Sequence, residues 1–286
     1  MKKTLIVLVS LIITLLSVSV ALAATSVDNV INNEKLLVSK DKTGVETVIN
    51  EKAVKAKEFL VKHKDDLNRK ELSELTSTDD LKNGNPYRVL IANTTLVNAL
   101  LEGTDLSSVL KDAPYHWEVP LISRSKPVAS FTVDDLDGKW EISEIGGYLS
   151  PDDSYFSSDT TIISKYLKDF GLSEADYFSH IRIPSLHMDV LYISAPQKEY
   201  FVPLLHSRDT LLGLNNKQIY DKNEFILAVG DELKNGLNNN QRSGVPKVNE
   251  TNVATGVNLK LILSIGLATL VVASILFIYF NPKANK

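Results

Sequence analysis

Two long apolar segments, one near each end of the chain, constrain this sequence more than any other feature. After Lys2 and Lys3, residues 5–20 are almost entirely apolar, and Ala21-Leu22-Ala23 follows. A basic start, an apolar stretch and an A-x-A motif in this order are typical of a secretory signal peptide. We therefore expect residues 1–23 to be a signal peptide, with Ala21 and Ala23 at the cleavage site. Because the apolar stretch is long, an uncleaved signal anchor is the alternative.

Residues 261–280 form the second segment and contain no charged residue. At about 1.5 Å per residue, a helix of this length covers the ~30 Å hydrocarbon core of a bilayer. The sequence predicts one transmembrane helix here and a short cytoplasmic tail at residues 281–286, which carries Lys283 and Lys286. The expected localisation is the cell membrane, single-pass, with the ectodomain outside and the C-terminus in the cytoplasm.

The segment between the two apolar stretches is acidic. Four of the 31 Lys and Arg residues lie outside residues 24–260, which leaves 27 basic residues against 35 acidic ones, a formal charge of −8. Surfaces that bind nucleic acid are basic, so this balance argues against a nucleic acid as partner. The chain has no cysteine. The fold therefore has no disulfides, thiol catalysis is excluded, and stability has to come from an ordinary buried core.

Apolar periodicity predicts an extracellular α+β domain at residues 51–234, built as one domain or two small modules, after a partly ordered lead-in at 24–50. The order β-β-β-α-β-β-β, with short gaps between strands, predicts mostly antiparallel sheets covered by helices. Residues 235–260 are polar and rich in Asn, which indicates a flexible stalk. The expected strands are 87–91, 118–123, 128–134, 139–145, 179–184, 188–194 and 199–206. The expected helices are 51–67, 159–170 and 224–234, together with one or two short helices at 95–111, interrupted at Gly103.

A short motif, Asn252-Val253-Ala254-Thr255-Gly256, stands just before the predicted span. A Thr-Gly pair, an apolar helix and terminal lysines in this order resemble the cell-wall sorting signal of Gram-positive surface proteins. In that family a sortase thiol attacks the Thr carbonyl and passes it to a peptidoglycan amine. Asn252 and Val253 replace the usual Leu and Pro, so the motif is closer to the Asn-Val-x-Thr-Gly variant. The resemblance covers the last 35 residues and implies sortase and peptidoglycan as partners; the alternative is a permanent membrane anchor.

Three histidines and an aspartate, His180, His187, Asp189 and His206, lie on or next to neighbouring predicted strands. They could converge as metal ligands, but they lack a tight ligand spacing such as His-Glu-x-x-His. We expect hydrogen-bonded histidines here, with no metal and no cofactor.

A second motif resembles a calcium loop, since Asp135, Asp137 and Gly138 are followed by Glu144. The first carboxylate ligand of such a loop is missing, because Val133 stands in its place. Asp-Gly between two strands is a strong hairpin signal, so we expect a hairpin turn.

Large aromatic residues flank this region. Trp117 and Trp140, with Tyr115 and Tyr148, are expected to pack beneath a helix rather than to form a ligand platform, because large aromatic side chains dominate cores.

The sequence contains no nucleophile elbow, phosphate loop or dinucleotide fingerprint. Our leading hypothesis is a non-enzymatic surface module that binds an extracellular ligand or another envelope protein. The alternative is a cell-surface hydrolase. It would use the three histidines named above, His180, His187 and His206, or the carboxylates of Asp152, Asp153, Asp189 and Glu199. A concave pocket in which two of these groups face each other would favour the hydrolase.

Overall fold

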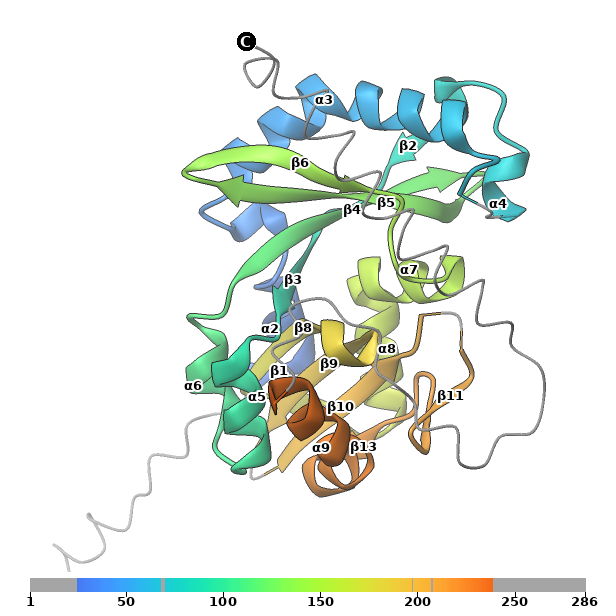
Figure 1. Cartoon of the computed structure of the whole chain (residues 1–286). Helices are drawn as coiled ribbons and strands as arrows, with labels where there is room; N and C mark the ends of the chain where they lie inside the picture. The colour runs from blue at the N-terminus through green and yellow to red at the C-terminus, as the bar shows by residue number, and fades with distance from the viewer. Residues whose placement is uncertain (1–24, 68–69, 197, 207, 239–286) are drawn as a thin grey trace, which may run out of the picture. The chain divides into compact units, whose positions relative to one another are not determined.

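A mixed sheet forms the centre of the fold (Figure 1). The computed structural model describes residues 25–67, 70–196, 198–206 and 208–238. Within them the main sheet has nine strands in the order β13-β10-β9-β8-β3-β4-β5-β6, with β2 paired to β4. Its strands are β2 (Lys82–Asn83), β3 (Tyr87–Ile91), β4 (Tyr115–Ser123), β5 (Lys126–Leu136), β6 (Lys139–Ile145), β8 (Tyr177–Ile183), β9 (Met188–Ala195), β10 (Lys198–Leu204) and β13 (Tyr220–Asp221).

One strand pair differs from all the others in this sheet. β3 and β8 run parallel and share only two residue pairs, Leu90 with Ile181 and Ile91 with Arg182. The remaining neighbours are antiparallel. The backbone ladder between the two sides of the sheet is therefore short at this point.

The β4 half of the sheet consists of β4, β5 and β6, with helix α3 (Lys42–His63) across one face (Figure 1). Gly44 of α3 lies against the ring of Trp140. The indole of Trp117, which is 1% exposed, donates to Asp41 Oδ2 at 3.2 Å, and the Tyr115 hydroxyl donates to the same oxygen at 2.9 Å. The prediction that these aromatic residues pack beneath a helix is confirmed for Trp117 and Trp140.

The β8 half consists of β8, β9 and β10 and has apolar clusters on both faces, because adjacent residues of a strand point to opposite sides. Ile181, Val190 and Phe201 pack with helices α5 (Thr94–Leu101), α6 (Leu106–Leu110) and α9 (Lys222–Asn238). On the other face, Phe178, Leu191 and Val202 pack with α2 (Val27–Asn32) and α8 (Thr160–Asp169).

The structure confirms the predicted α+β class with mostly antiparallel pairing, and several boundaries differ. The first long helix begins at Lys42 instead of Glu51, so the predicted lead-in contributes to the folded part. A helix that the periodicity did not predict, α7 (Pro151–Ser158), precedes α8. The other elements are β1 (Thr25–Ser26), η1 (Leu36–Val38), α4 (Lys70–Ser73), η2 (Thr78–Asp80), β7 (Glu174–Ala175), η3 (Pro184–Leu186), β11 (Thr210–Leu211) and β12 (Leu214–Asn215).

The edge strand β6 is joined to β5 by a tight turn. Asp137 and Gly138 both have positive φ, 55° and 82°, and the flanking residues Leu136 and Lys139 pair with each other. This is the two-residue hairpin that Asp-Gly predicts, rather than a calcium loop. The register shifts between Thr132 and Val133, which leaves Ser143 of β6 as an extra residue.

The features predicted at the two ends of the chain lie outside the described residues. These are the signal peptide with Ala21 and Ala23, most of the stalk, the sorting motif at 252–256, the span at 261–280 and the tail. In the described ranges, no helix has the length and apolar character that a membrane crossing requires.

Candidate functional site

Ionisable side chains gather at the centre of the sheet, where β4 and β8 flank β3. We call this group the central ion cluster, and its members are His116, Glu118, His180, Arg182, Asp189 and His206. All of them are buried except His206, which is largely buried. Buried ionisable groups that contact one another are a feature of functional sites, so this cluster is the candidate site.

Strand geometry explains why these residues meet. His116 and Glu118 are two residues apart on β4, and His180 and Arg182 are two residues apart on β8, so each pair shares one face of its strand. Arg182 stands directly opposite Asp189 in the antiparallel pairing of β8 with β9. The cluster lies on the sheet face that also carries Phe178 and Leu191.

Arg182 connects the two halves of the sheet. Its Nε and Nη2 atoms donate to the two oxygens of Asp189 at 2.9 and 3.0 Å, which is the bidentate geometry that a guanidinium offers a carboxylate. Its Nη1 and Nη2 atoms also lie 3.4 Å from Glu118 Oε2. One buried cation thus faces two carboxylates, one from each half.

This arrangement keeps both carboxylates ionised. Burial raises the pKa of Glu118, but the Arg182 guanidinium and the hydrogen bonds from His116 and Ser130 outweigh burial and hold that pKa at about 2. Burial acts in the same way on Asp189, where Arg182, His180 and His206 hold the pKa well below its ordinary value. The carboxylates are therefore structural counter-ions rather than proton donors near neutral pH.

Two histidines flank the carboxylate of Asp189. His180 Nε2 lies 3.0 Å from Oδ2, and His206 Nε2 lies 3.1 Å from Oδ1. The predicted hydrogen-bonded histidines are thus confirmed at His180 and His206. His187 does not join them: burial lowers its pKa, and its Nε2 atom has no hydrogen-bond partner among the described residues.

Tyr148 covers the cluster from outside. Its ring lies over the Arg182 guanidinium at 4.5 Å and against the ring of His206 at 5.9 Å. Burial and the neighbouring Glu144 raise the pKa of the Tyr148 hydroxyl above its ordinary value. Tyr148 is nevertheless 38% exposed. The prediction that it packs beneath a helix is therefore wrong, and its ring instead separates a buried cation from solvent.

The four carboxylates proposed for a hydrolase do not come together. Asp189 belongs to the central ion cluster, whereas Asp153 has its own partners, Lys217 Nζ at 2.7 Å and Asn216 Nδ2 at 3.0 Å. Glu199 accepts from the Tyr192 hydroxyl at 2.5 Å and pairs with Lys222. Asp152 is exposed on α7. Only Asp189 thus faces histidines.

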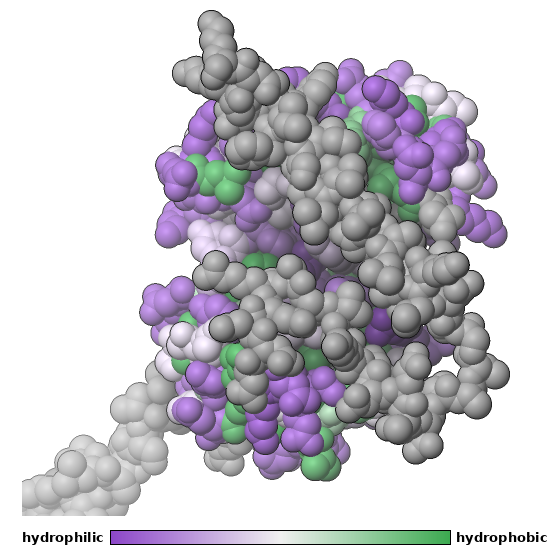
Figure 2. Space-filling view, viewed as in Figure 1, coloured by the Kyte–Doolittle hydropathy of each residue, from purple (hydrophilic) through white to green (hydrophobic). Residues whose placement is uncertain are grey.

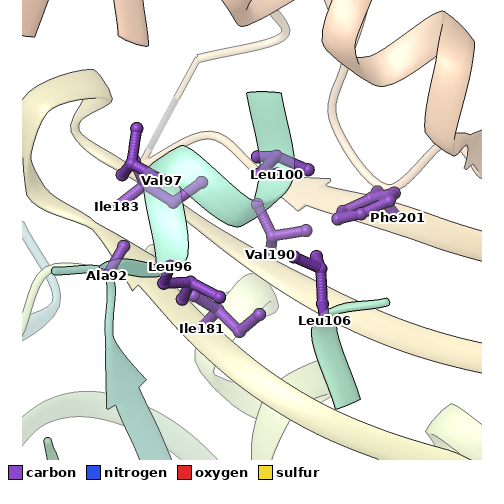
Figure 3. A pocket seen from close by; sticks show the side chains of 9 residues that line it. All are labelled: Ala92, Leu96, Val97, Leu100, Leu106, Ile181, Ile183, Val190 and Phe201. Atoms are coloured by element: carbon purple, nitrogen blue, oxygen red, sulfur yellow. The ribbon is translucent and has the colours of Figure 1, made fainter. Parts of the chain in front are cut away.

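Neither of two cavities in the described part of the chain opens onto the central ion cluster. One has a volume of about 20 Å³ and is lined by the nine apolar side chains labelled in Figure 3, which come from α5, α6, β8, β9, β10 and the end of β3. Its β8 residues Ile181 and Ile183 face away from Arg182. The second, between β5 and the start of α7, has no room for a water molecule. Among the described residues, no group of three or more His, Asp or Glu side chains could hold a metal ion.

Sequence reasoning missed three members of the cluster, His116, Glu118 and Arg182. A signal for them was present, since charged or polar residues occupy alternate positions in strands whose other residues are apolar. Such residues share one face of the strand, and a charge buried on that face requires a partner.

The fold and the cluster together define an α+β protein whose mixed sheet carries a buried ion cluster at its centre. Comparison with protein-family models, with curated proteins and with solved structures gives no match for this chain.

Proposed function

We propose that this chain is an exported surface protein, anchored to the membrane or the cell wall, whose folded part binds another molecule and catalyses no reaction. The observation that carries the second half of this proposal is the pairing of charges in the central ion cluster. Both carboxylates are partners of Arg182, which lies beneath Tyr148. A general acid or base has to exchange a proton near neutral pH, whereas these carboxylates stay ionised as counter-ions of Arg182.

The first half rests on the sequence. Lys2 and Lys3 followed by an apolar stretch support export, and the uncharged residues 261–280 support a membrane anchor with the C-terminus inside. Asn252 to Gly256 support transfer to peptidoglycan by a sortase. The acidic charge of residues 24–260 supports a partner other than nucleic acid.

The surface does not single out a docking face. The visible face in Figure 2 is largely hydrophilic over α3, with separate hydrophobic areas. Exposed large apolar side chains are spread over different elements, with Leu37 and Val38 on η1, Leu136 on β5 and Leu227 on α9. We therefore assign binding to the folded part as a whole.

A hydrolase is the second candidate, because Asp189 lies within hydrogen-bond distance of His180 and His206. A carboxylate that orients a histidine is part of many hydrolytic sites. The two candidates differ in one measurable property. A hydrolase loses turnover when Asp189→Asn or His206→Gln is introduced. A binding module shows no turnover in the wild type or in either variant.

The anchor is tested by mass spectrometry of the protein released from purified cell walls by muralytic digestion. A C-terminus at Thr255 joined to wall fragments supports sorting, whereas an intact Lys286 in the membrane fraction supports a permanent span. Protease added to intact, wall-stripped cells should degrade residues 25–238. Protection until lysis would overturn export.

The binding function is tested on intact cells with an amine-reactive cross-linker and on purified full chain with panels of peptide, ester and glycoside substrates. We expect cross-links from lysines of residues 25–238 to one recurring envelope component and no turnover. Turnover that disappears in Asp189→Asn would overturn the proposal in favour of the hydrolase.

A further inference from the structure

The sheet face around the central ion cluster is polar over several adjacent strands. Glu144 on β6, Ser130 and Thr132 on β5 and the cluster residues of β4, β8 and β9 occupy this face. Ser130 and Thr132 are 3% and 4% exposed, so the face is covered. Buried sheet faces are ordinarily apolar, because polar groups lose hydration there. A covered polar face therefore suggests that the cover is not permanent.

The cover consists of residues 146–158, the loop that begins with Gly146-Gly147 and continues into α7. Tyr148 of this loop lies over Arg182, and α7 contacts β5. Leu149, Pro151 and Ser154 line the small space above Ser130. Figure 1 shows α7 beside β5, next to α8.

The attachment of the cover is mostly polar. The buried residues of α7 are Asp153, Ser154, Phe156 and Ser157, of which only Phe156 belongs to an apolar cluster. Ser157 Oγ is buried and has no hydrogen-bond partner among the described residues. The cover thus has two apolar anchors, Leu149 and Phe156, and one ion pair, Asp153 with Lys217, and it leaves one buried hydroxyl unpaired. So small a set of attachments belongs to the low-stability end of a fold.

The cover also has two places where the backbone can turn. Gly146 and Gly147 have φ values of 134° and 78°, which glycine adopts without strain. At the other end, Asp159 is extended (φ −105°, ψ 100°) and separates α7 from α8. The segment between these points is thus a short unit with a hinge at each side.

We propose that residues 146–158 act as a lid that opens as a unit and gives a ligand access to the central ion cluster. In the closed state Tyr148 occupies the position over Arg182 that an incoming planar or anionic group would take. The inference deepens the proposed binding function by placing the binding event at this cluster. Opening is measured without any ligand. A result against the lid therefore leaves the proposed binding function standing, and a failure to find a binding partner leaves the lid standing.

Opening is measured on the purified full chain in detergent by modification of histidines with diethyl pyrocarbonate, followed by mass spectrometry of each peptide. His116 and His180 are 7% and 4% exposed in the closed state, so a rise in their modification rates reports that the central ion cluster has become accessible. The side chain of His63 on α3 is 35% exposed and serves as an internal control. Amide hydrogen exchange of β9 reports global unfolding in the same samples.

Two neighbouring glycines give a matched pair of opening variants. A Cβ at Gly147 would clash with the Ser130 side chain and lie 3.1 Å from its backbone nitrogen, whereas a Cβ at Gly146 meets no atom within 4 Å. Alanine is strained more by the φ of 134° at Gly146 than by the φ of 78° at Gly147, so additional opening in Gly147→Ala comes from the clash with Ser130 and not from backbone strain. We expect Gly147→Ala to raise the modification rates of His116 and His180 at least about tenfold above those of Gly146→Ala, with His63 unchanged.

A closing variant tests the inference without destabilising the protein. Ser157→Ala removes the orphan hydroxyl, so the lid should open less often and the two histidines should react about tenfold more slowly. The lid is overturned if Gly147→Ala and Ser157→Ala both leave these rates at the wild-type value. It is also overturned if the β9 amides lose protection together with the histidines, because the opening is then global.

Discussion

The two halves of the sheet bury their faces in different ways. The β8 half is apolar on both sides, with α5, α6 and α9 on one face and α2 and α8 on the other. The β4 half is apolar only beneath α3, and its opposite face carries Ser130, Thr132, Glu118 and His116. Apolar burial alone can therefore hold the β8 half together, whereas the β4 half depends on paired charges that β8 and β9 supply. The pairing of β3 with β8, the stacking of Tyr87 on His180 and the Arg182 bridge contribute to that connection.

Removal of the arginine's main partner should have the largest effect. Asp189→Asn leaves the Arg182 cation with Glu118 alone at 3.4 Å, and breaking a buried pair in this way costs about 3–5 kcal/mol. Both tryptophans, Trp117 and Trp140, lie in the β4 half. We expect the urea transition measured by their fluorescence to separate from the transition measured by far-UV circular dichroism.

The control for this variant is Asp152→Asn, the same change at an exposed carboxylate, which should stay within about 0.5 kcal/mol of wild type. Coincident transitions in Asp189→Asn would show that the two halves unfold as one unit. The contrast between the halves would then be one of composition and not of stability.

A lower pH should weaken the connection between the halves, because it protonates Glu118, the partner of Arg182 that the β4 half supplies. The pKa of Glu118 is about 2 in the folded state against an ordinary value of 4.5. A lowered folded pKa contributes stability above about pH 4.5 that is lost as the pH falls towards 2, and for this shift the contribution is about 3 kcal/mol. Glu118→Gln should lower stability at pH 7 and much less at pH 3, as measured by urea unfolding at both values.

Asp189 acts in the same direction, since its pKa is also lowered, so wild type should keep some acid sensitivity in any Glu118 variant. Glu58→Gln at an exposed position of α3 should change stability equally little at both pH values. A Glu118→Gln deficit that is the same at pH 3 and pH 7 would contradict the assignment of Glu118 as the ionised partner.

Glycine-to-alanine changes in the helices of the two halves should have opposite signs. A Cβ at Gly44 would collide with the ring of Trp140, so Gly44→Ala should destabilise the protein by about 1–3 kcal/mol. In α9, a Cβ at Gly230 would lie 3.5 Å from Ile226 and 3.7 Å from Leu101, which is ordinary contact. Gly230→Ala should stabilise the protein by about 0.4–1 kcal/mol through the unfolded chain.

Thermal unfolding of the two glycine variants measures the difference directly. A neutral Gly44→Ala would mean that the contact of α3 with Trp140 contributes little to stability. The β4 half would then depend even more on its paired charges than the structure indicates.

The smallest effect is expected on the edge strand. Burial raises the pKa of Glu144, whereas hydrogen bonds from Lys139 and Lys52 lower the pKa of Glu141. A raised folded pKa means stability that is present below the ordinary value and is lost as the pH rises. Glu144→Gln should therefore stabilise slightly at pH 7, and Glu141→Gln should destabilise slightly. Melting temperatures at pH 4 and pH 7 test both signs, and equal signs would contradict the burial difference.

The sequence predicted those parts of the fold that local patterns specify. The β4–β5–β6 meander, the Asp137-Gly138 turn and α9 follow from alternation, turn chemistry and helical period. The helix α7 was missed because Pro151–Ser158 has no apolar stripe and is held by contacts with distant residues. The parallel pairing of β3 with β8 was missed because its partners, such as Leu90 and Ile181, are 91 residues apart and leave no local trace of their partnership.

The candidate site was predicted only in part, for a related reason. His180, Asp189 and His206 were selected because their strands are neighbours in sequence. Arg182 and Glu118 were not, since they meet across the β3–β8 pairing. A pattern of polar residues at alternate strand positions identifies such residues as buried, but their partners become visible only when the order of the strands is known.

The edge strand β6 affects how this protein behaves at high local concentration. An uncovered strand such as β6 presents free backbone groups that a neighbouring chain could pair with, and this is a common route to aggregation. The extra residue Ser143 interrupts its regular spacing, and Lys139 and Glu141 place charges along it. These features hinder self-association through β6, so the molecules can be packed densely without joining sheet to sheet.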